Sequence, residues 1–121
     1  MKTLTQVVQE SANKVAAENG SVILYAASAF CGRIARAFIE SGIQPQCICD
    51  GDTTKHGKRY YGFDVLSPDE ALLKYPNAKI FITSLFHAPA IIGHLVYNLG
   101  IEPERILNYE EVAWKKKLRT A

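Results

Sequence analysis

The chain lacks the long apolar runs that membrane proteins require. A membrane-spanning helix needs roughly 20 mostly apolar residues. The longest nearly uncharged apolar stretch of these 121 residues, 22–31, is about half that length. The N-terminus also lacks a cationic segment followed by an apolar one, which is the layout of a signal peptide. We therefore expect a soluble, cytoplasmic protein with no membrane partner.

Cysteine is scarce, and its three copies, Cys31, Cys47 and Cys49, form an odd set. With 48% apolar residues the chain can build a core without disulfides, so reduced thiols are expected. Cys47 and Cys49 would share one face of a strand, and no second Cys or His pair completes a zinc site. We expect core packing for these thiols and no metal site.

Positive charge is in small excess and gathers at the C-terminus. The net charge is +2, but residues 115–119 hold four of the cations, which leaves ten basic and twelve acidic groups in residues 1–114. A nucleic-acid binder spreads Lys and Arg over a folded face or a helix and adds aromatic residues for stacking. The terminal cluster is typical of a solvated tail, so we expect no nucleic-acid partner.

Short strands and helices alternate along the chain. Apolar runs rich in β-branched and aromatic residues predict strands covered on both faces, whereas apolar residues three and four apart predict amphipathic helices. Residues 51–62 are polar and flanked by glycine, which predicts a loop. The expected strands are 21–26, 47–49, 63–66, 79–84 and 105–107, and the expected helices are 3–19, 30–41, 68–75, 88–99 and a C-terminal helix capped by Asn108. Asn19-Gly20 supplies a left-handed stop for the first helix, and Gly42 and Gly100 are expected to end the second and the fourth.

This alternation predicts an α/β fold with a parallel sheet and right-handed crossovers. We expect one three-layer, Rossmann-like domain over residues 1–121, with a parallel five-stranded sheet in the order 3-2-1-4-5. An extra helix in residues 1–20 precedes the core in residues 21–110. Residues 111–121 add the C-terminal helix and the basic tail.

The ligand crevice of such a sheet lies beyond the carboxyl ends of the strands, where the strand order reverses. Here that point lies between the strands that end near Ala26 and Ser84. The first crossover puts Ala27, Ala29 and Gly32 at the three glycine positions of a G-x-G-x-x-G loop, and only the third is glycine. A methyl group at either of the first two positions occupies space that a pyrophosphate needs.

Two interpretations of this crossover stay open. The free amides at the start of the second helix favour an anion, and Arg33 could assist from the first turn. Alternatively, the loop serves only the tight packing of strand against helix. The candidate ligand-binding residues of the crossover are Ala27, Ser28, Ala29, Phe30, Gly32 and Arg33.

Polar residues after the other strands complete the candidate site. Asp50 follows Ala27 by 23 residues, roughly where a dinucleotide fingerprint has its ribose-binding acid, and Asp52 comes next. The same two residues are equally typical of a carboxylate-rich turn. Ser84 and His87 follow the fourth strand, and His87 is either a ligand contact or general base, or a capping or surface histidine.

Other chemically active residues have weaker patterns. Lys55, Lys58 and Arg59 could meet a 2′-phosphate or simply be solvated. We expect His94 to lie on the third crossover helix, away from the strand ends. Cys31 sits near a helix N-terminus, which would lower its pKa, although a small packing residue is the simpler interpretation.

One catalytic pattern is excluded. Tyr75 and Lys79 match the Tyr-x-x-x-Lys of short-chain dehydrogenases, whose chemistry needs both side chains on one helical face. Pro76 ends the helix and Lys79 begins a strand, so the two side chains are not expected to act together.

Seven short motifs occur in the order found in a known group of domains. They are Ile23-Leu24-Tyr25, Gly32-Arg33, Cys49-Asp50-Gly51-Asp52, Lys55-His56-Gly57-Lys58, residues 62–70 (GFDVLSPDE), Gly100-Ile101 and Arg105-Ile106. Over residues 21–110 the chain thus resembles the small Rossmann-like domains of polysaccharide-biosynthesis enzymes, including the C-terminal part of sugar C-methyltransferases and the N-terminal part of sugar acetyltransferases. The resemblance implies that the strand-end loops face a nucleotide, a nucleotide sugar or NAD(P).

Three functions remain open. The first is a nucleotide or nucleotide-sugar binding module that is not catalytic alone and is linked to sugar metabolism. The second is a subunit of an NAD(P)-dependent oxidoreductase that works with a separate catalytic partner protein. The third is a degenerate module that binds only protein. The identity of the cofactor is unknown, and a homodimer is open.

Overall fold

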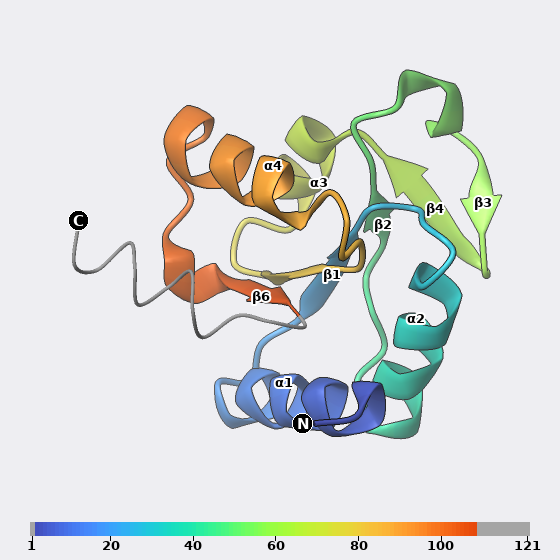
Figure 1. Cartoon of the computed structure of the whole chain (residues 1–121), viewed down its shortest axis with the longest axis vertical. Helices are drawn as coiled ribbons and strands as arrows, with labels where there is room; N and C mark the ends of the chain where they lie inside the picture. Colours follow the sequence, from blue (N-terminus) through green and yellow to red (C-terminus); the bar gives the residue numbers. More distant parts are fainter. Residues whose placement is uncertain (1, 109–121) are drawn as a thin grey trace.

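The computed structural model describes residues 2–108, in which a six-stranded sheet lies between two layers of helices (Figure 1). Helices α1 and α2 cover one face of the sheet and α3 and α4 cover the other. The expected C-terminal helix and basic tail lie outside the described residues. The helices are α1 (Leu4–Ala17), α2 (Cys31–Glu40), α3 (Pro68–Lys74) and α4 (Ala88–Gly93); the strands are β1 (Val22–Tyr25), β2 (Ile48–Cys49), β3 (Arg59–Tyr60), β4 (Phe63–Leu66), β5 (Lys79–Ile82) and β6 (Ile106–Asn108); the short helical turns are η1 (Thr53–Lys55), η2 (His94–Asn98) and η3 (Pro103–Arg105).

The sheet order is β3-β4-β2-β1-β5-β6, and the last five strands are parallel neighbours. This confirms the predicted order 3-2-1-4-5. The strand order reverses between β1 and β5, which pair from Val22 with Lys79 to Tyr25 with Ile82. The carboxyl ends of β1 and β5 therefore meet at one edge of the sheet, where open α/β sheets bind their ligands.

Alternation along the strands divides the core between the two faces of the sheet. All four residues of β1 are buried. Val22 and Leu24 pack with α1 and α2, whereas Ile23 and Tyr25 belong to the cluster on the side of α3 and α4. Because both faces are covered, β1 is apolar throughout, which is the pattern that identified it in the sequence.

Helix α1 is fixed at its start by a capping box. The Thr3 hydroxyl accepts from Gln6 N at 3.1 Å, and the Gln6 side chain accepts from Thr3 N at 2.8 Å. At the other end Asn19 adopts a φ of 51°, the left-handed stop that the sequence predicts. No helix within residues 2–108 is long and apolar enough to cross a membrane.

The prediction of a loop over residues 51–62 is wrong in its second half. There Arg59 and Tyr60 form β3, which pairs antiparallel with β4. The connecting residues Tyr61 and Gly62 have φ values of 53° and 85°, as in a two-residue type I′ hairpin turn. Such turns favour Asn-Gly or Asp-Gly, and a tyrosine at positive φ gives no such signal in the sequence. Arg59 reinforces the hairpin by donating to Gly62 O and to Asp64 Oδ1.

The helix expected over residues 88–99 lies in the predicted place, but its second half is not α-helical. After α4, η2 is a π-helix, and Leu99 N donates to His94 O at 3.1 Å. Gly100, at a φ of 67°, ends the segment as predicted. Single π-turns within helices are frequently found at functional sites, and this one begins at His94.

Candidate functional site

A cavity of about 450 Å³ opens where the carboxyl ends of β1, β2 and β5 meet α4. Its volume falls in the range of small-molecule sites. Five of the candidate residues named from the sequence line it: Ser28, Asp50, Asp52, Ser84 and His87. The other lining residues are Tyr25, Ala26, Gly51, Lys55, Ala90, Ile91 and His94. Residues from three strand-end loops thus converge on one space.

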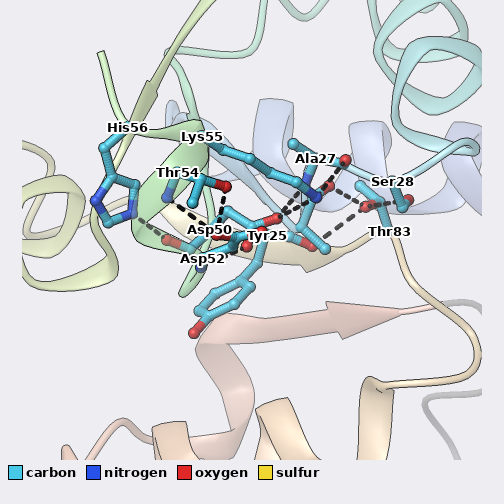
Figure 2. A network of polar contacts seen from close by, with 10 residues as sticks. Tyr25, Ala27, Ser28, Asp50, Asp52, Thr54, Lys55, His56 and Thr83 are labelled. Carbon is cyan, nitrogen blue, oxygen red and sulfur yellow. Dashed lines mark hydrogen bonds and ion pairs between the residues drawn. The ribbon is translucent and has the colours of Figure 1, made fainter. Parts of the chain in front are cut away.

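Asp50 connects two of these loops (Figure 2). Its Oδ2 accepts from Ala27 N at 2.8 Å, and its Oδ1 accepts from Asp52 N at 2.8 Å. The Lys55 ammonium lies 3.6 Å from Asp50 Oδ2 and donates to Ala27 O at 3.2 Å. Both carboxylate oxygens of Asp50 therefore accept hydrogen bonds from backbone amides, so Asp50 positions the loops after β1 and β2 relative to each other.

Asp52 begins the turn η1. Its Oδ1 accepts from Thr54 N at 3.0 Å and from Thr54 Oγ1 at 2.7 Å, and these hydrogen bonds hold the pKa of Asp52 below its usual value. Nearby, His56 Nε2 lies 2.5 Å from Asp50 O, to which it donates in the tautomer protonated at Nε2. Asp52 is exposed on the cavity wall, so its carboxylate is accessible to a ligand.

Ala26, directly after β1, has a φ of 95°, which an L-residue rarely adopts. Thr83, which the sequence interpretation did not single out, supports this turn. Its hydroxyl lies 2.6 Å from Ala26 O, 3.2 Å from Tyr25 O and 3.1 Å from Ser28 Oγ. A strained backbone conformation of this kind costs about 1–3 kcal/mol. It persists only where the surrounding contacts hold it in place, often at ligand sites.

Ser84 and His87 form the loop between β5 and α4. Ser84 is buried, and its hydroxyl accepts from His87 N at 3.1 Å, which fixes the start of α4. The His87 ring packs edge-on against Phe86, with 5.1 Å between ring centroids. Phe86 itself is 88% exposed, so the loop presents an aromatic side chain beside a cavity-lining histidine.

The rest of the predicted anion site does not line this cavity. Phe30 and Arg33 line a separate cavity of about 170 Å³ on the side of α1 and α2. A Cβ at Gly32 would lie 2.5 Å from Cε1 of Tyr61, so the glycine lets the β3–β4 hairpin pack against α2. Ala29 is exposed, and Ala27 packs in the core while its amide binds Asp50.

The expectation that His94 lies away from the strand ends is wrong. His87, Ala90, Ile91 and His94 follow the i, i+3, i+4, i+7 spacing of one helix face, and all four line the cavity. This spacing was visible in the sequence. Tyr25, the last residue of β1, is a second lining residue that the sequence interpretation did not assign to the site.

The packing role preferred for Cys31 is confirmed, and the helix N-terminus does not lower the pKa of its thiol. Cys31 is completely buried, and burial raises the pKa of its thiol to about 12. Burial likewise raises the pKa of Cys47 to about 11. Desolvation thus outweighs the helix N-terminus, and all three cysteines are free, buried thiols. Within residues 2–108 no group of three His, Cys, Asp or Glu side chains is placed to hold a metal ion.

No protein-family model and no curated protein matches the sequence. A solved structure with a similar fold is UDP-D-quinovosamine 4-dehydrogenase from Vibrio fischeri. The similarity has a TM-score of 0.55 at 16% identity and covers 83% of this chain and 85% of that one. At this identity the likeness shows the fold, which is the Rossmann-like α/β class predicted from the sequence.

Proposed function

We propose that the chain is a binding module for a nucleotide or nucleotide sugar, held in the cavity at the carboxyl ends of β1, β2 and β5. The observation that carries the proposal is the convergence of three strand-end loops, residues 26–28, 50–55 and 84–87, on one cavity beside the point where strand order reverses. In open α/β sheets this is where ligands bind.

The polar lining suits the parts of such a ligand. The Asp52 carboxylate can accept hydrogen bonds from ribose or sugar hydroxyl groups. Among the described residues that line the cavity, Lys55 supplies the positive charge that can attract a phosphate group. Ser28 and Ser84 add hydroxyl groups. The solved neighbour is named as an enzyme of a UDP-sugar, which supports UDP-sugars as the first probes.

We also infer a link to nucleotide-sugar or polysaccharide biosynthesis, with catalysis in a partner protein, as the resemblance of residues 21–110 implies. An NAD(P)-dependent oxidoreductase subunit is the second candidate. Tyr25, His87 and His94 favour it, because groups that transfer protons line the same cavity.

Thermal unfolding in the presence of NAD, NADP, CoA, UDP-sugars and S-adenosylmethionine tests the proposal. A ligand at 100 times its Kd stabilises the protein by about 2.7 kcal/mol. We expect stabilisation by a UDP-sugar, weakened in Lys55→Ala and unchanged in the control Lys58→Ala, which alters an exposed lysine outside the cavity. Stabilisation by none of the panel contradicts the proposal, and stabilisation by NAD(P) alone favours the second candidate.

A further inference from the structure

Tyr25 places a buried phenol in the cavity. The residue is only 6% exposed, yet none of the hydrogen bonds among residues 2–108 involves its hydroxyl group. No buried side-chain oxygen is left without a partner in this part of the chain, so the hydroxyl group must keep access to open space. Tyr25 lines the cavity at the carboxyl end of β1, and we infer that its hydroxyl group reaches open space there.

The phenol is directed away from the charged network of the cavity wall (Figure 2), but the charges of Asp50 and Asp69 still act on it: after burial, they also raise its pKa. Figure 2 shows its ring directed away from the Asp50, Asp52 and Lys55 network, with the hydroxyl group at the far end. Burial is the main cause that raises the pKa of Tyr25 to about 12, so the group remains a hydrogen-bond donor at neutral pH. It is therefore a fixed, neutral donor without an acceptor among the described residues.

The charges of the lining favour a neutral occupant. Asp50 and Asp52 against Lys55 leave one net negative charge when the histidines are neutral. Lys55 is already engaged with Asp50 and Ala27 O. A phosphate placed deeper in the cavity would meet this negative charge, whereas ligand hydroxyl groups can donate to the exposed Asp52 carboxylate.

The wall formed by α4 combines apolar and polar groups. Ala90 and Ile91 offer carbon surface, and His87 and His94 offer ring nitrogens that donate or accept. A pyranose ring has this same combination of C–H faces and hydroxyl groups. The α4 wall, the Tyr25 hydroxyl group and the carboxylates together match a sugar better than they match a charged group.

We propose that the α4 side of the cavity binds the glycosyl group of a nucleotide sugar and that Tyr25 Oη donates a hydrogen bond to it. This inference rests on the function proposed above and specifies which part of the ligand lies where. The diphosphate then lies toward the opening of the cavity, outside the reach of Tyr25.

Calorimetric titration with UDP and with UDP-N-acetylglucosamine tests this arrangement. In the unaltered protein the sugar should tighten binding relative to UDP. Tyr25→Phe should reduce this sugar-dependent gain about 2- to 10-fold, as expected for one net hydrogen bond, while leaving the affinity for UDP unchanged. The control Tyr75→Phe removes a hydroxyl group from α3's C-terminal end, outside the cavity, and should change neither affinity.

A steric variant tests the same point without removing a polar group. Ala90→Leu enlarges an exposed residue on the cavity wall and should bring the affinity for the UDP-sugar down to that for UDP. Ala16→Leu, on the exposed face of α1, is the matched control. Equal affinities for UDP and the UDP-sugar, or equal losses for both in Tyr25→Phe, overturn this inference alone. Binding of neither probe also overturns this inference, and absence of stabilisation by every member of the thermal panel overturns the proposed function as well.

Discussion

The edge of the sheet where β1 and β5 end is packed differently on its two sides. On the α2 side, the Tyr61 ring of the hairpin lies against Gly32, and Phe30 and Arg33 line a separate cavity of about 170 Å³. On the α4 side, a cavity of about 450 Å³ reaches Tyr25 and His94. The one glycine at the three positions of the G-x-G-x-x-G spacing is thus explained by packing against Tyr61, and the larger cavity lies across the sheet from it.

Core substitutions on the two sides of the sheet should have the largest effect on stability, and they test whether the α4 side is open because its core is packed less tightly. Leu24 and Ile82 are almost fully buried, Leu24 in the cluster facing α1 and α2 and Ile82 in the cluster facing α3 and α4. Replacing either by Ala should lower the free energy of unfolding by about 2–5 kcal/mol. Urea unfolding measures both, and a much smaller loss for Ile82→Ala would mean that the α4 side is loosely packed.

Alkaline pH should destabilise both sides. Cys31, in the α2 cluster, and Tyr25, in the α4 cluster, have pKa values raised by burial to about 12 from 9.0 and 10.0. Between pH 9 and 11 the unfolded chain loses these protons while the native chain keeps them, so stability must fall as the pH rises. Melting temperatures at pH 8, 10 and 11 check this trend. In Tyr25→Phe the melting temperature should fall less steeply with rising pH, because one of these two buried acidic groups is gone.

Replacing Asp50 should loosen the loops that frame the α4 cavity. Asp50→Ala removes the acceptor for Ala27 N and Asp52 N, and we expect a loss of about 1.5–3 kcal/mol, typical of hydrogen bonds to a charged group. The control Asp64→Ala breaks an exposed ion pair with Arg59 and should cost about 0–1 kcal/mol. Similar losses in the two variants, measured in urea, contradict a positioning role for Asp50.

The smallest expected effect concerns the packed α2 side. Gly32→Ala should cost about 1 kcal/mol, because the new methyl group would displace the Tyr61 ring. In a Tyr61→Asn background, which also suits the positive φ of the turn, the same change should be neutral or stabilising. A double-mutant cycle by urea unfolding gives the coupling, and additivity would show that Gly32 and Tyr61 do not interact.

Strand order and helix positions could be predicted because the apolar runs of β1 and β5 and the stops at Asn19, Gly42 and Gly100 act locally. All three stops adopt positive φ as expected. The β3–β4 hairpin could not be predicted, since Tyr61 holds its turn conformation through packing on a residue distant in the sequence.

The candidate site could be predicted where it follows from topology. Asp50 directly follows β2, Ser84 and His87 lie in the loop after β5, and parallel strands place such residues at one edge of the sheet. The sequence could not show that the Asp50 oxygens are used by backbone amides, or on which side of β1 the open space lies. Both depend on how the loop after β1 turns at Ala26.

Amide chemical shifts recorded during titration with UDP-N-acetylglucosamine show on which side of the sheet the ligand binds. We expect shifts concentrated in residues 25–28, 50–55 and 84–94, with Gly32 and Arg33 on the α2 side little affected. Shifts concentrated at Phe30, Gly32 and Arg33, with the α4 wall unchanged, would contradict this expectation, because the ligand would then bind on the packed side of the sheet.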